Sequence, residues 1–339
     1  MRTEENDVLR ALITGIAGFA GSHLAEYLLA ETDWEVWGTI HHTEHNVRHL
    51  RDQVNLRYVD LRAPAEVTDL LREVRPDRVY HLAGQSYVPA SWDDPWQTFE
   101  TNVRSQVNLI EAILTAGLTP RVLIVASDQE YGAITPDDLP LDEQTPLRPA
   151  SPYAVSKVAQ DMLGLQYHLN YDLFVVRVRP FNHIGPRQRS EFVAPAFARQ
   201  LAEIEAGLRP PVVRVGNLDA RRDFTDVRDM VHAYSLALER GEAGAVYNIG
   251  AGRAHSIREL LDILLDLSTA QVTVERDPTR MRPSDVPEVI CDAAKFCTQT
   301  GWAPQVPFHE SLRSVLNYWR QRVQARTELS RSEGVTSHA

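Results

Sequence analysis

The chain contains little cysteine and has no long apolar run. Only Cys291 and Cys297 occur in 339 residues, and no CxxC pair is present, which excludes a disulfide scaffold and the common cysteine zinc motifs. A reducing, cytoplasmic location is therefore expected. No stretch approaches the roughly 20 apolar residues of a membrane span, so no membrane contact is expected. The N-terminus, MRTEENDVLR, lacks an apolar run after a basic start and predicts no signal peptide.

Positive charge is also in deficit. Lysine and arginine total 35 against 46 acidic residues, a net charge of −11, so no nucleic-acid partner is expected. A local arginine cluster could still bind a small anionic substrate. Four of the twelve histidines, His41, His42, His45 and His49, lie in one segment without the accompanying ligands of a known metal site. We expect solvated surface there and no metal.

Short apolar runs alternate with helical patterns in the first half of the chain. Strand-like runs occupy 9–14, 35–40, 56–60, 78–82, 121–127 and 173–179, and helical patterns occupy 19–30, 64–74, 98–117 and 151–170. Strands that alternate with helices predict an α/β fold, a doubly wound parallel sheet of the Rossmann type.

The pattern changes after about residue 180. Helical segments near 191–206, 227–240, 256–268 and 308–323 are separated by short strand candidates at 212–215, 245–248 and 272–275. This predicts a smaller C-terminal α/β lobe. We expect the first domain to span 8–180 with part of 217–250, and the lobe to span 181–216 and 250–323. The polar, aperiodic residues 325–339 predict a disordered tail.

Three glycines follow the first strand and open a helix. Gly15 permits a tight turn, Gly18 lets a pyrophosphate approach the backbone, and Gly21 lets the helix pack close to the sheet. The free amides of the helix N-terminus favour phosphate. The segment therefore predicts a dinucleotide site to which Ala17 and Phe19 also belong, and an ordinary turn is the alternative.

The ends of the following strands complete this predicted site. An acidic residue after the second strand would hold the ribose 2′-hydroxyl of NAD, but Ile40 is followed by His41 and His42. The missing acid favours NADPH, with Arg48 a candidate for the 2′-phosphate, and NADH remains open because the histidines are equally consistent with plain surface. Asp60 and Leu61 after the third strand, and Leu82 and Ala83 after the fourth, are further expected cofactor contacts.

A tyrosine and a lysine lie four residues apart in the 151–170 helix. Tyr153 and Lys157 therefore share one face, and Ser151-Pro152 is a plausible helix start. A nearby ammonium favours the phenolate and should lower the pKa of the phenol, which would let it exchange a proton near neutral pH. Taken alone, an exposed helix face is the competing interpretation.

Together these motifs resemble the extended short-chain dehydrogenase/reductase family over about residues 8–320. The matching residues are Thr14–Gly21, Asp60-Leu61, His81-Leu82-Ala83, Ser127 and Tyr153…Lys157. The resemblance implies that Ser127 polarises the substrate oxygen, Tyr153 is the acid/base and Lys157 orients the nicotinamide ribose. Asn102 is similar to an asparagine that supports the active site in relatives, or else packs a helix on a strand. A homodimer formed through the helices at 98–117 and 151–170 is also implied.

Three later segments narrow the resemblance. RPFNHIGP at 179–186, GNLDARRDFTDVRD at 216–229 and RPSDVP at 282–287 resemble enzymes that act on GDP-linked 6-deoxyhexoses. Their amino-acid sequences are closer to those of the ketone reductases of that group than to those of the 4,6-dehydratases. We expect Arg222 and Arg282 to pair with the pyrophosphate, with surface salt bridges as the alternative. The other expected substrate contacts are Ser86, Gln129, Asn182, Arg187, Asn217 and Asp285.

One sequence position is expected to distinguish a ketone reductase from a 4,6-dehydratase. By resemblance, a dehydratase removes the C5 proton with a glutamate two residues after the catalytic Ser or Thr, and that position holds Gln129. A neutral amide cannot remove this proton, and Glu130, one residue on, should point to the opposite face.

We therefore expect NAD(P)H-dependent reduction of the C4 ketone of GDP-4-keto-6-deoxy-D-mannose to GDP-D-rhamnose. The alternatives are a GDP-mannose 4,6-dehydratase, a reductase or epimerase acting on another nucleotide sugar, and a non-catalytic NAD(P) sensor. The stereochemistry at C4, rhamnose against 6-deoxy-talose, stays open at this stage.

Overall fold

The computed structural model describes residues 8–280 and 286–335, which form two compact units. Unit 1 comprises the chain up to Phe181 together with Val227–Gly252 and Cys291–Pro304. Unit 2 comprises Asn182–Asp226, Arg253–Ile290 and the residues from Gln305 onward. Within the described stretches, no helix combines the length and apolar character needed to cross a membrane.

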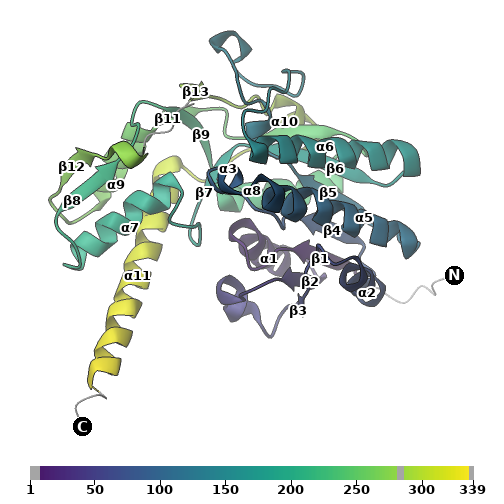
Figure 1. Cartoon of the computed structure of the whole chain (residues 1–339), viewed down its shortest axis with the longest axis horizontal. Helices are drawn as coiled ribbons and strands as arrows, with labels where there is room; N and C mark the ends of the chain where they lie inside the picture. Colours follow the sequence, from purple (N-terminus) through teal and green to yellow (C-terminus); the bar gives the residue numbers. More distant parts are fainter. Residues whose placement is uncertain (1–7, 281–285, 336–339) are drawn as a thin grey trace. The chain divides into compact units, whose positions relative to one another are not determined.

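Unit 1 is built on a parallel sheet of seven strands in the order β10-β6-β5-β4-β1-β2-β3 (Figure 1). The strands are β1 (Arg10–Thr14), β2 (Glu35–Ile40), β3 (Asn55–Tyr58), β4 (Arg78–His81), β5 (Arg121–Val125), β6 (Val175–Pro180) and β10 (Val246–Ile249). This confirms the predicted doubly wound fold. The order runs outward in both directions from the β1–β4 pair, so a ligand crevice is expected at the carboxyl ends of these two strands.

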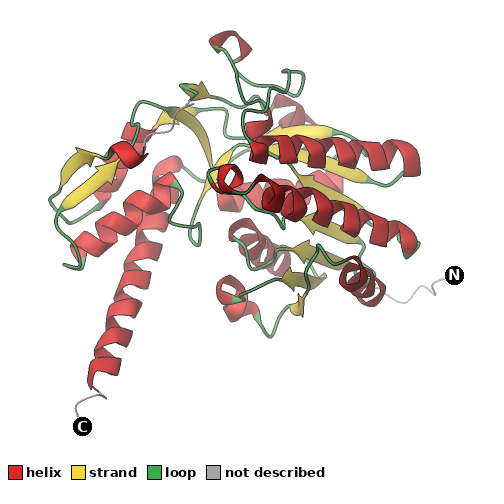
Figure 2. Cartoon of the chain, viewed as in Figure 1, coloured by secondary structure: helices red, strands yellow, loops and turns green. Residues whose placement is uncertain are grey.

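Helices cover both faces of this sheet because successive strand residues point in opposite directions (Figure 2). In β1, Ile13 packs in the core beneath α1 (Phe19–Glu31) and α8 (Val227–Arg240). Its neighbour Leu12 packs in the core beneath α2 (Pro64–Val74), α5 (Ser105–Thr115) and α6 (Pro152–Tyr171).

The expected helix at 98–117 is not continuous. It consists of α4 (Pro95–Phe99), a π-helical turn η2 (Glu100–Arg104) and then α5, and the short α3 (Ala90–Asp93) precedes it. The π turn contains Asn102, whose side chain is fully buried. Single π turns within helices frequently mark functional sites.

Unit 2 has its own core and two small sheets. Strand β9 (Arg221–Asp226) pairs with β7 (Asn182–Ile184), β11 (Ala254–Ser256) and β13 (Glu288–Val289), and β8 (Val212–Val215) pairs with β12 (Thr273–Arg276). Helices α7 (Val193–Glu205), α9 (Ile257–Leu267) and α11 (Phe308–Val335) share the core. No strand was predicted at β7, β9, β11 or β13, because these strands are short and rich in polar residues.

Two expected boundaries differ from the structure. Residues 291–304, assigned to the lobe, belong to unit 1 because Phe296 and Trp302 of the α10 (Ala294–Thr300) region pack into its core. The Trp302 indole Nε1 also donates to the Asp229 carbonyl at 3.0 Å. The expected disordered tail is helical over 325–335, where α11 continues past Val323 with bonds such as Thr327 Oγ1 to the Val323 carbonyl at 2.9 Å. Residues 336–339 lie outside the described chain.

Candidate active site

The turn after β1 leaves no space for a side chain at two of its glycines. Gly15 has φ +72°, and a Cβ there would stand 2.9 Å from Ala83 Cα. A Cβ at Gly21 would collide with the Gly15 carbonyl oxygen, so that glycine brings α1 against the turn. The Gly15 amide donates to Thr39 Oγ1 at 3.1 Å, which ties the turn to the end of β2.

The start of α1 is open to an anionic ligand. Gly18 is the N-cap and is exposed, and within the described residues no side chain caps the first turn. Ala17 and Phe19 are half-buried on either side of it. Outward-facing amides at a helix N-terminus suit a pyrophosphate. The residues present therefore fit the dinucleotide that the glycine spacing predicted.

Asp60, the acidic residue after β3, already contacts other side chains of the protein. Asp60 accepts three hydrogen bonds from the Arg62 guanidinium, at 2.9, 3.2 and 2.8 Å, and its Oδ2 lies 3.7 Å from His41 Nε2. The Arg62 hydrogen bond is the main reason that the pKa of Asp60 falls to about 2. Leu61 beside it is buried, and Leu82 and Ala83 are half-buried after β4. Ala83 N–H donates to Thr14 Oγ1 at 3.2 Å, which joins the ends of β4 and β1.

The structure brings Ser127, Tyr153 and Lys157 together at the carboxyl end of β5. Ser127 is the N-cap of the 3-10 turn η3 (Asp128–Glu130), and its hydroxyl lies close enough to the Tyr153 phenol to lower the pKa of that phenol. Tyr153 lies in the first turn of α6, where Ser151 Oγ accepts the Ala154 N–H at 3.1 Å. Lys157 Nζ donates to the Val125 carbonyl at 2.9 Å. All three catalytic candidates are buried.

Burial dominates the electrostatics of these groups. It raises the pKa of Tyr153 above its ordinary value, with a smaller opposing effect from the Ser127 hydrogen bond. Burial also lowers the pKa of Lys157 to about 8. The expected lowering of the phenol pKa by the lysine is therefore wrong for this structure. Nζ lies 6.0 Å from the centre of the phenol ring and is bound to a carbonyl instead.

Asn102 connects the loop after β4 to helix α6. Its Oδ1 accepts the Gln85 N–H at 2.7 Å, and its Nδ2 donates to the Gln85 carbonyl at 3.2 Å and to Ser156 Oγ at 2.9 Å. The Ser156 hydroxyl in turn donates to the Tyr153 carbonyl at 2.7 Å. The exposed Ser86 lies in the loop that Asn102 holds.

The two residues considered as a proton-accepting base have different environments. Gln129 is half-buried, and its Nε2 lies 3.4 Å from Asp128 Oδ2. Glu130 is completely buried, and its Oε1 accepts the Ser127 N–H at 3.2 Å. The carboxyl of Glu130 therefore faces the protein interior.

Four expected substrate contacts lie in unit 2. Asn182 in β7 and Arg222 in β9 are on paired strands, and Arg222 Nη1 donates to the Val286 carbonyl at 2.8 Å. Asn217 Oδ1 accepts the Asp219 N–H at 3.0 Å. Arg187 has φ +72°, a backbone conformation that is uncommon outside glycine and often found at functional sites. Arg282 and Asp285 lie outside the described residues.

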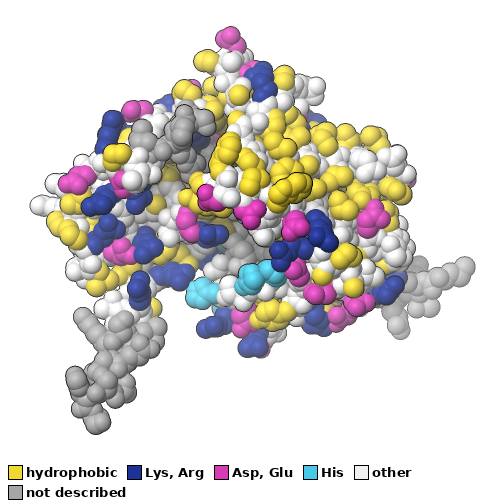
Figure 3. Space-filling view, viewed as in Figure 1, with side chains coloured by type: hydrophobic (Ala, Val, Ile, Leu, Met, Phe, Trp, Pro, Cys, Tyr) yellow, Lys and Arg dark blue, Asp and Glu magenta, His cyan; other side chains and the backbone are white. Residues whose placement is uncertain are grey.

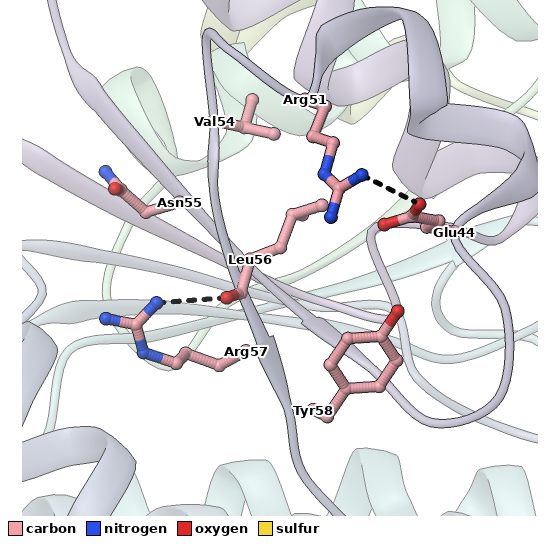
Figure 4. A pocket seen from close by; sticks show the side chains of 7 residues that line it. All are labelled: Glu44, Arg51, Val54, Asn55, Leu56, Arg57 and Tyr58. Atoms are coloured by element: carbon pink, nitrogen blue, oxygen red, sulfur yellow. Dashed lines mark hydrogen bonds and ion pairs between the residues drawn. The ribbon is translucent and has the colours of Figure 1, made fainter.

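Asp128 was not predicted as a site residue, although its Oδ1 accepts from the Ser127 hydroxyl at 3.2 Å. Its position directly after Ser127, the candidate catalytic serine, was the available signal. No cluster of metal-ligating side chains occurs within residues 8–280 and 286–335. A surface pocket beside β3 contains none of the candidate catalytic residues (Figure 4), being lined by Glu44, Arg51, Val54, Asn55, Leu56, Arg57 and Tyr58.

Comparison with known proteins matches most of the chain. The family model described as GDP-mannose 4,6 dehydratase matches residues 12–315. A curated relative, GDP-6-deoxy-D-mannose reductase of Pseudomonas aeruginosa, is 39% identical over 93% of this chain and 98% of its own length. GDP-mannose 4,6 dehydratase 2 of Arabidopsis thaliana is 32% identical over 91% of this chain and 86% of its own length.

Solved structures show the same similarity. The structure of RMD from Pseudomonas aeruginosa complexed with NADPH has a TM-score of 0.83 and 37% identity, and it covers 93% of this chain and 100% of that one. The Thermus thermophilus UDP-glucose 4-epimerase complex with NAD has a TM-score of 0.82 and 32% identity, over 92% of this chain and 99% of that one.

Proposed function

The chain belongs to the GDP-mannose 4,6-dehydratase family of extended short-chain dehydrogenases/reductases, which are NAD(P)-dependent enzymes, and we propose that it is a reductase within that family. The proposed reaction reduces the C4 ketone of GDP-4-keto-6-deoxy-D-mannose to GDP-D-rhamnose with NADPH or NADH. The observation that carries this proposal is Gln129, an amide at the position where a dehydratase needs a base.

The chain's own groups supply the proton chemistry of a ketone reduction. A bound reduced nicotinamide would supply the hydride that reduces C4. The Tyr153 phenol donates the balancing proton to O4, and burial keeps that phenol protonated at neutral pH. The Ser127 hydroxyl, already beside the phenol, hydrogen-bonds the same oxygen and stabilises its developing negative charge. Lys157 would orient the nicotinamide ribose.

Dehydration would need a further base, and neither candidate suits that role. The amide of Gln129 has no site that accepts a proton near neutral pH. Glu130 is buried against the Ser127 amide and has no exposed surface. The geometry therefore supports simple reduction over loss of water from C6.

We assign substrate recognition to the remaining polar residues. Arg222 and Arg282 would bind the pyrophosphate, because guanidinium groups pair well with phosphate oxygens. The other proposed contacts to the nucleotide sugar are Ser86, Gln129, Asn182, Arg187, Asn217 and Asp285.

The proposal includes a homodimer in the cytoplasm. Val155, Met162 and Leu169 recur every seven residues along α6, and each is at least 40% exposed. Apolar side chains gather on this face of unit 1 (Figure 3). A seven-residue apolar repeat on an exposed helix is typical of a helix that packs against a partner helix. Free thiols at Cys291 and Cys297 fit a reducing compartment.

The deciding experiment offers the purified protein two substrates. It receives GDP-mannose alone, and separately GDP-4-keto-6-deoxy-D-mannose with NADPH or NADH. Nucleotide sugars are followed by chromatography, and the reduced cofactor by absorbance. Oxidation of the cofactor only with the keto sugar is the expected result, whereas keto sugar formed from GDP-mannose alone would refute the proposal. The Tyr153→Phe variant should lose turnover about 10²–10⁴-fold and still bind NADPH.

A further inference from the structure

A group of buried charges lies directly behind the catalytic serine. It contains Glu130, Asp161, Arg177 and Arg179, all of which are at most 5% exposed. Proton transfer to the substrate uses none of them. Buried charged groups are costly to desolvate, so their presence beside the catalytic groups calls for a physical reason.

Glu130 holds the turn that carries Ser127. Its Oε1 accepts the Ser127 N–H at 3.2 Å, while Ser127 Oγ accepts the Gln129 N–H at 3.2 Å. These reciprocal bonds form a capping box on η3. They fix the backbone from which the Ser127 hydroxyl projects.

The other end of the Glu130 carboxyl reaches strand β6. Oε2 lies 3.1 Å from Arg179 Nε, an ion pair rather than an aligned hydrogen bond. Arg179 Nη2 donates to Asp161 Oδ2 at 2.6 Å, and Arg177 Nη1 donates to Asp161 Oδ1 at 2.5 Å. Both carboxylate oxygens of Asp161 therefore accept a hydrogen bond from an arginine.

Asp161 belongs to the helix that carries the other two catalytic groups. It lies one turn beyond Lys157 and two turns beyond Tyr153 on α6. The contacts therefore run from the Ser127 turn, through Glu130 and Arg179, to the helix of Tyr153 and Lys157. All of them lie within unit 1.

We propose that Glu130 is a positioning residue, which fixes the Ser127 hydroxyl relative to Tyr153 through Arg179 and Asp161. The inference rests on the proposed reduction, in which both hydroxyls must reach the same substrate oxygen. A displacement of about 1 Å in such a pair can reduce the rate about 10²-fold.

The charge of Glu130 also acts on the proton donor. The groups that face Tyr153 are Ser127, Asp128 and Glu130 on the η3 side, Lys157 on its own helix and Tyr234 on α8. The negative charges of Asp128 and Glu130 both raise the pKa of Tyr153. Burial and the nearby Asp161 charge raise the pKa of Glu130 itself, and the Arg179 charge opposes them.

The test compares two substitutions at the same position in the full-length enzyme. Glu130→Gln keeps an oxygen that can accept the Ser127 N–H, whereas Glu130→Leu keeps the volume but loses the acceptor. We expect kcat to fall several-fold in Glu130→Gln and about 10²-fold in Glu130→Leu. The dissociation constant for NADPH, measured by its fluorescence, should stay within about threefold because the glycine turn is untouched.

Tyr131→Phe is the matched control. It removes a buried hydroxyl that contacts Asn248 Oδ1 at 2.7 Å and Arg179 Nη1 at 3.2 Å, next to Glu130 but without a bond to Ser127. It should lower the melting temperature and leave kcat within about threefold. The positioning role is refuted if Glu130→Leu keeps wild-type kcat. It is equally refuted if Tyr131→Phe loses as much kcat as Glu130→Leu at a similar melting temperature.

Amide hydrogen exchange separates this inference from the proposed reaction. A wild-type protein that oxidises no NADPH with the keto sugar would refute the reaction only. In either case, exchange in peptides containing 127–130 should accelerate at least tenfold in Glu130→Leu, less in Glu130→Gln, and remain at the wild-type rate in Tyr131→Phe. Unchanged exchange in Glu130→Leu would show that Glu130 does not hold the Ser127 turn.

Discussion

At the scale of single residues, the proposed preference for reduction over dehydration rests on the amide of Gln129. Its side chain lies beside Asp128, which follows Ser127, and is partly accessible. A carboxylate introduced here would lie close to Asp128. Like charges at short distance raise a carboxyl pKa, which brings its basicity closer to the neutral range.

We predict that Gln129→Glu gains the ability to remove the C5 proton. With GDP-4-keto-6-deoxy-D-mannose in D2O, incorporation of deuterium at C5 should accelerate about 10²-fold, because a positioned general base contributes at least that factor. Nuclear magnetic resonance of the sugar measures the exchange. Gln129→Asn, which adds no base, is the control and should exchange at the wild-type rate. Equal exchange in the two variants would contradict this role for position 129.

His41 offers a second prediction at the same scale. It follows β2, whose Thr39 hydroxyl accepts a hydrogen bond from the Gly15 amide of the glycine turn. The His41 imidazole lies 3.7 Å from the Asp60 carboxylate, which also accepts hydrogen bonds from Arg62. An imidazole N–H there can donate a hydrogen bond to a 2′-phosphate, whereas an acid suits the 2′-hydroxyl of NADH. His41→Asp should weaken NADPH binding about tenfold, or about 1.4 kcal/mol, and strengthen NADH binding. Fluorescence titration with both cofactors measures this. His49→Ala, at a histidine already paired with Glu26 at 2.6 Å, should change neither constant.

At the scale of elements, the caps of two helices provide a matched pair. Ser151 Oγ accepts the Ala154 N–H at 3.1 Å at the start of α6, and Ser256 Oγ accepts the Glu259 N–H at 3.0 Å at the start of α9. Each Ser→Ala change should lower the unfolding free energy by about 1 kcal/mol in urea titrations. Only Ser151→Ala should also lower kcat, because Tyr153 lies in the first turn of α6. An equal loss of kcat in Ser256→Ala would contradict this explanation.

At the scale of the whole molecule, the apolar stripe on α6 predicts association. Leu169 is 71% exposed in the single chain, and burying such a side chain at an interface is favourable by about 1.5–3 kcal/mol. Leu169→Glu, alone or with Met162→Glu, should therefore convert a dimer to monomers in sedimentation velocity. Leu208→Glu, at a leucine 55% exposed in unit 2, is the control and should remain dimeric. A wild-type chain that sediments as a monomer at micromolar concentration would refute the dimer.

Much of unit 1 could be predicted from local patterns. The spans of β2 and α2 agree with the predicted 35–40 and 64–74, because a short apolar run marks the first and a helical periodicity marks the second. The glycine turn was predictable because Gly15 and Gly21 occupy positions where any side chain would collide. In unit 2, β9 was not predictable, since its sequence RRDFTD is stabilised by pairing with β7, β11 and β13.

The sequence by itself determined the doubly wound sheet and the glycine turn, because these depend on local spacing, and its family resemblance predicted Ser127, Tyr153 and Lys157 as candidate catalytic residues. Only the tertiary structure decided the direction of their pKa shifts and the contacts that surround them. Burial raises the pKa of Tyr153 against the expected effect of Lys157, and it encloses Glu130 between the Ser127 amide and Arg179. Desolvation and long-range ion pairs depend on which distant segments pack together, so no local pattern along the chain specifies them.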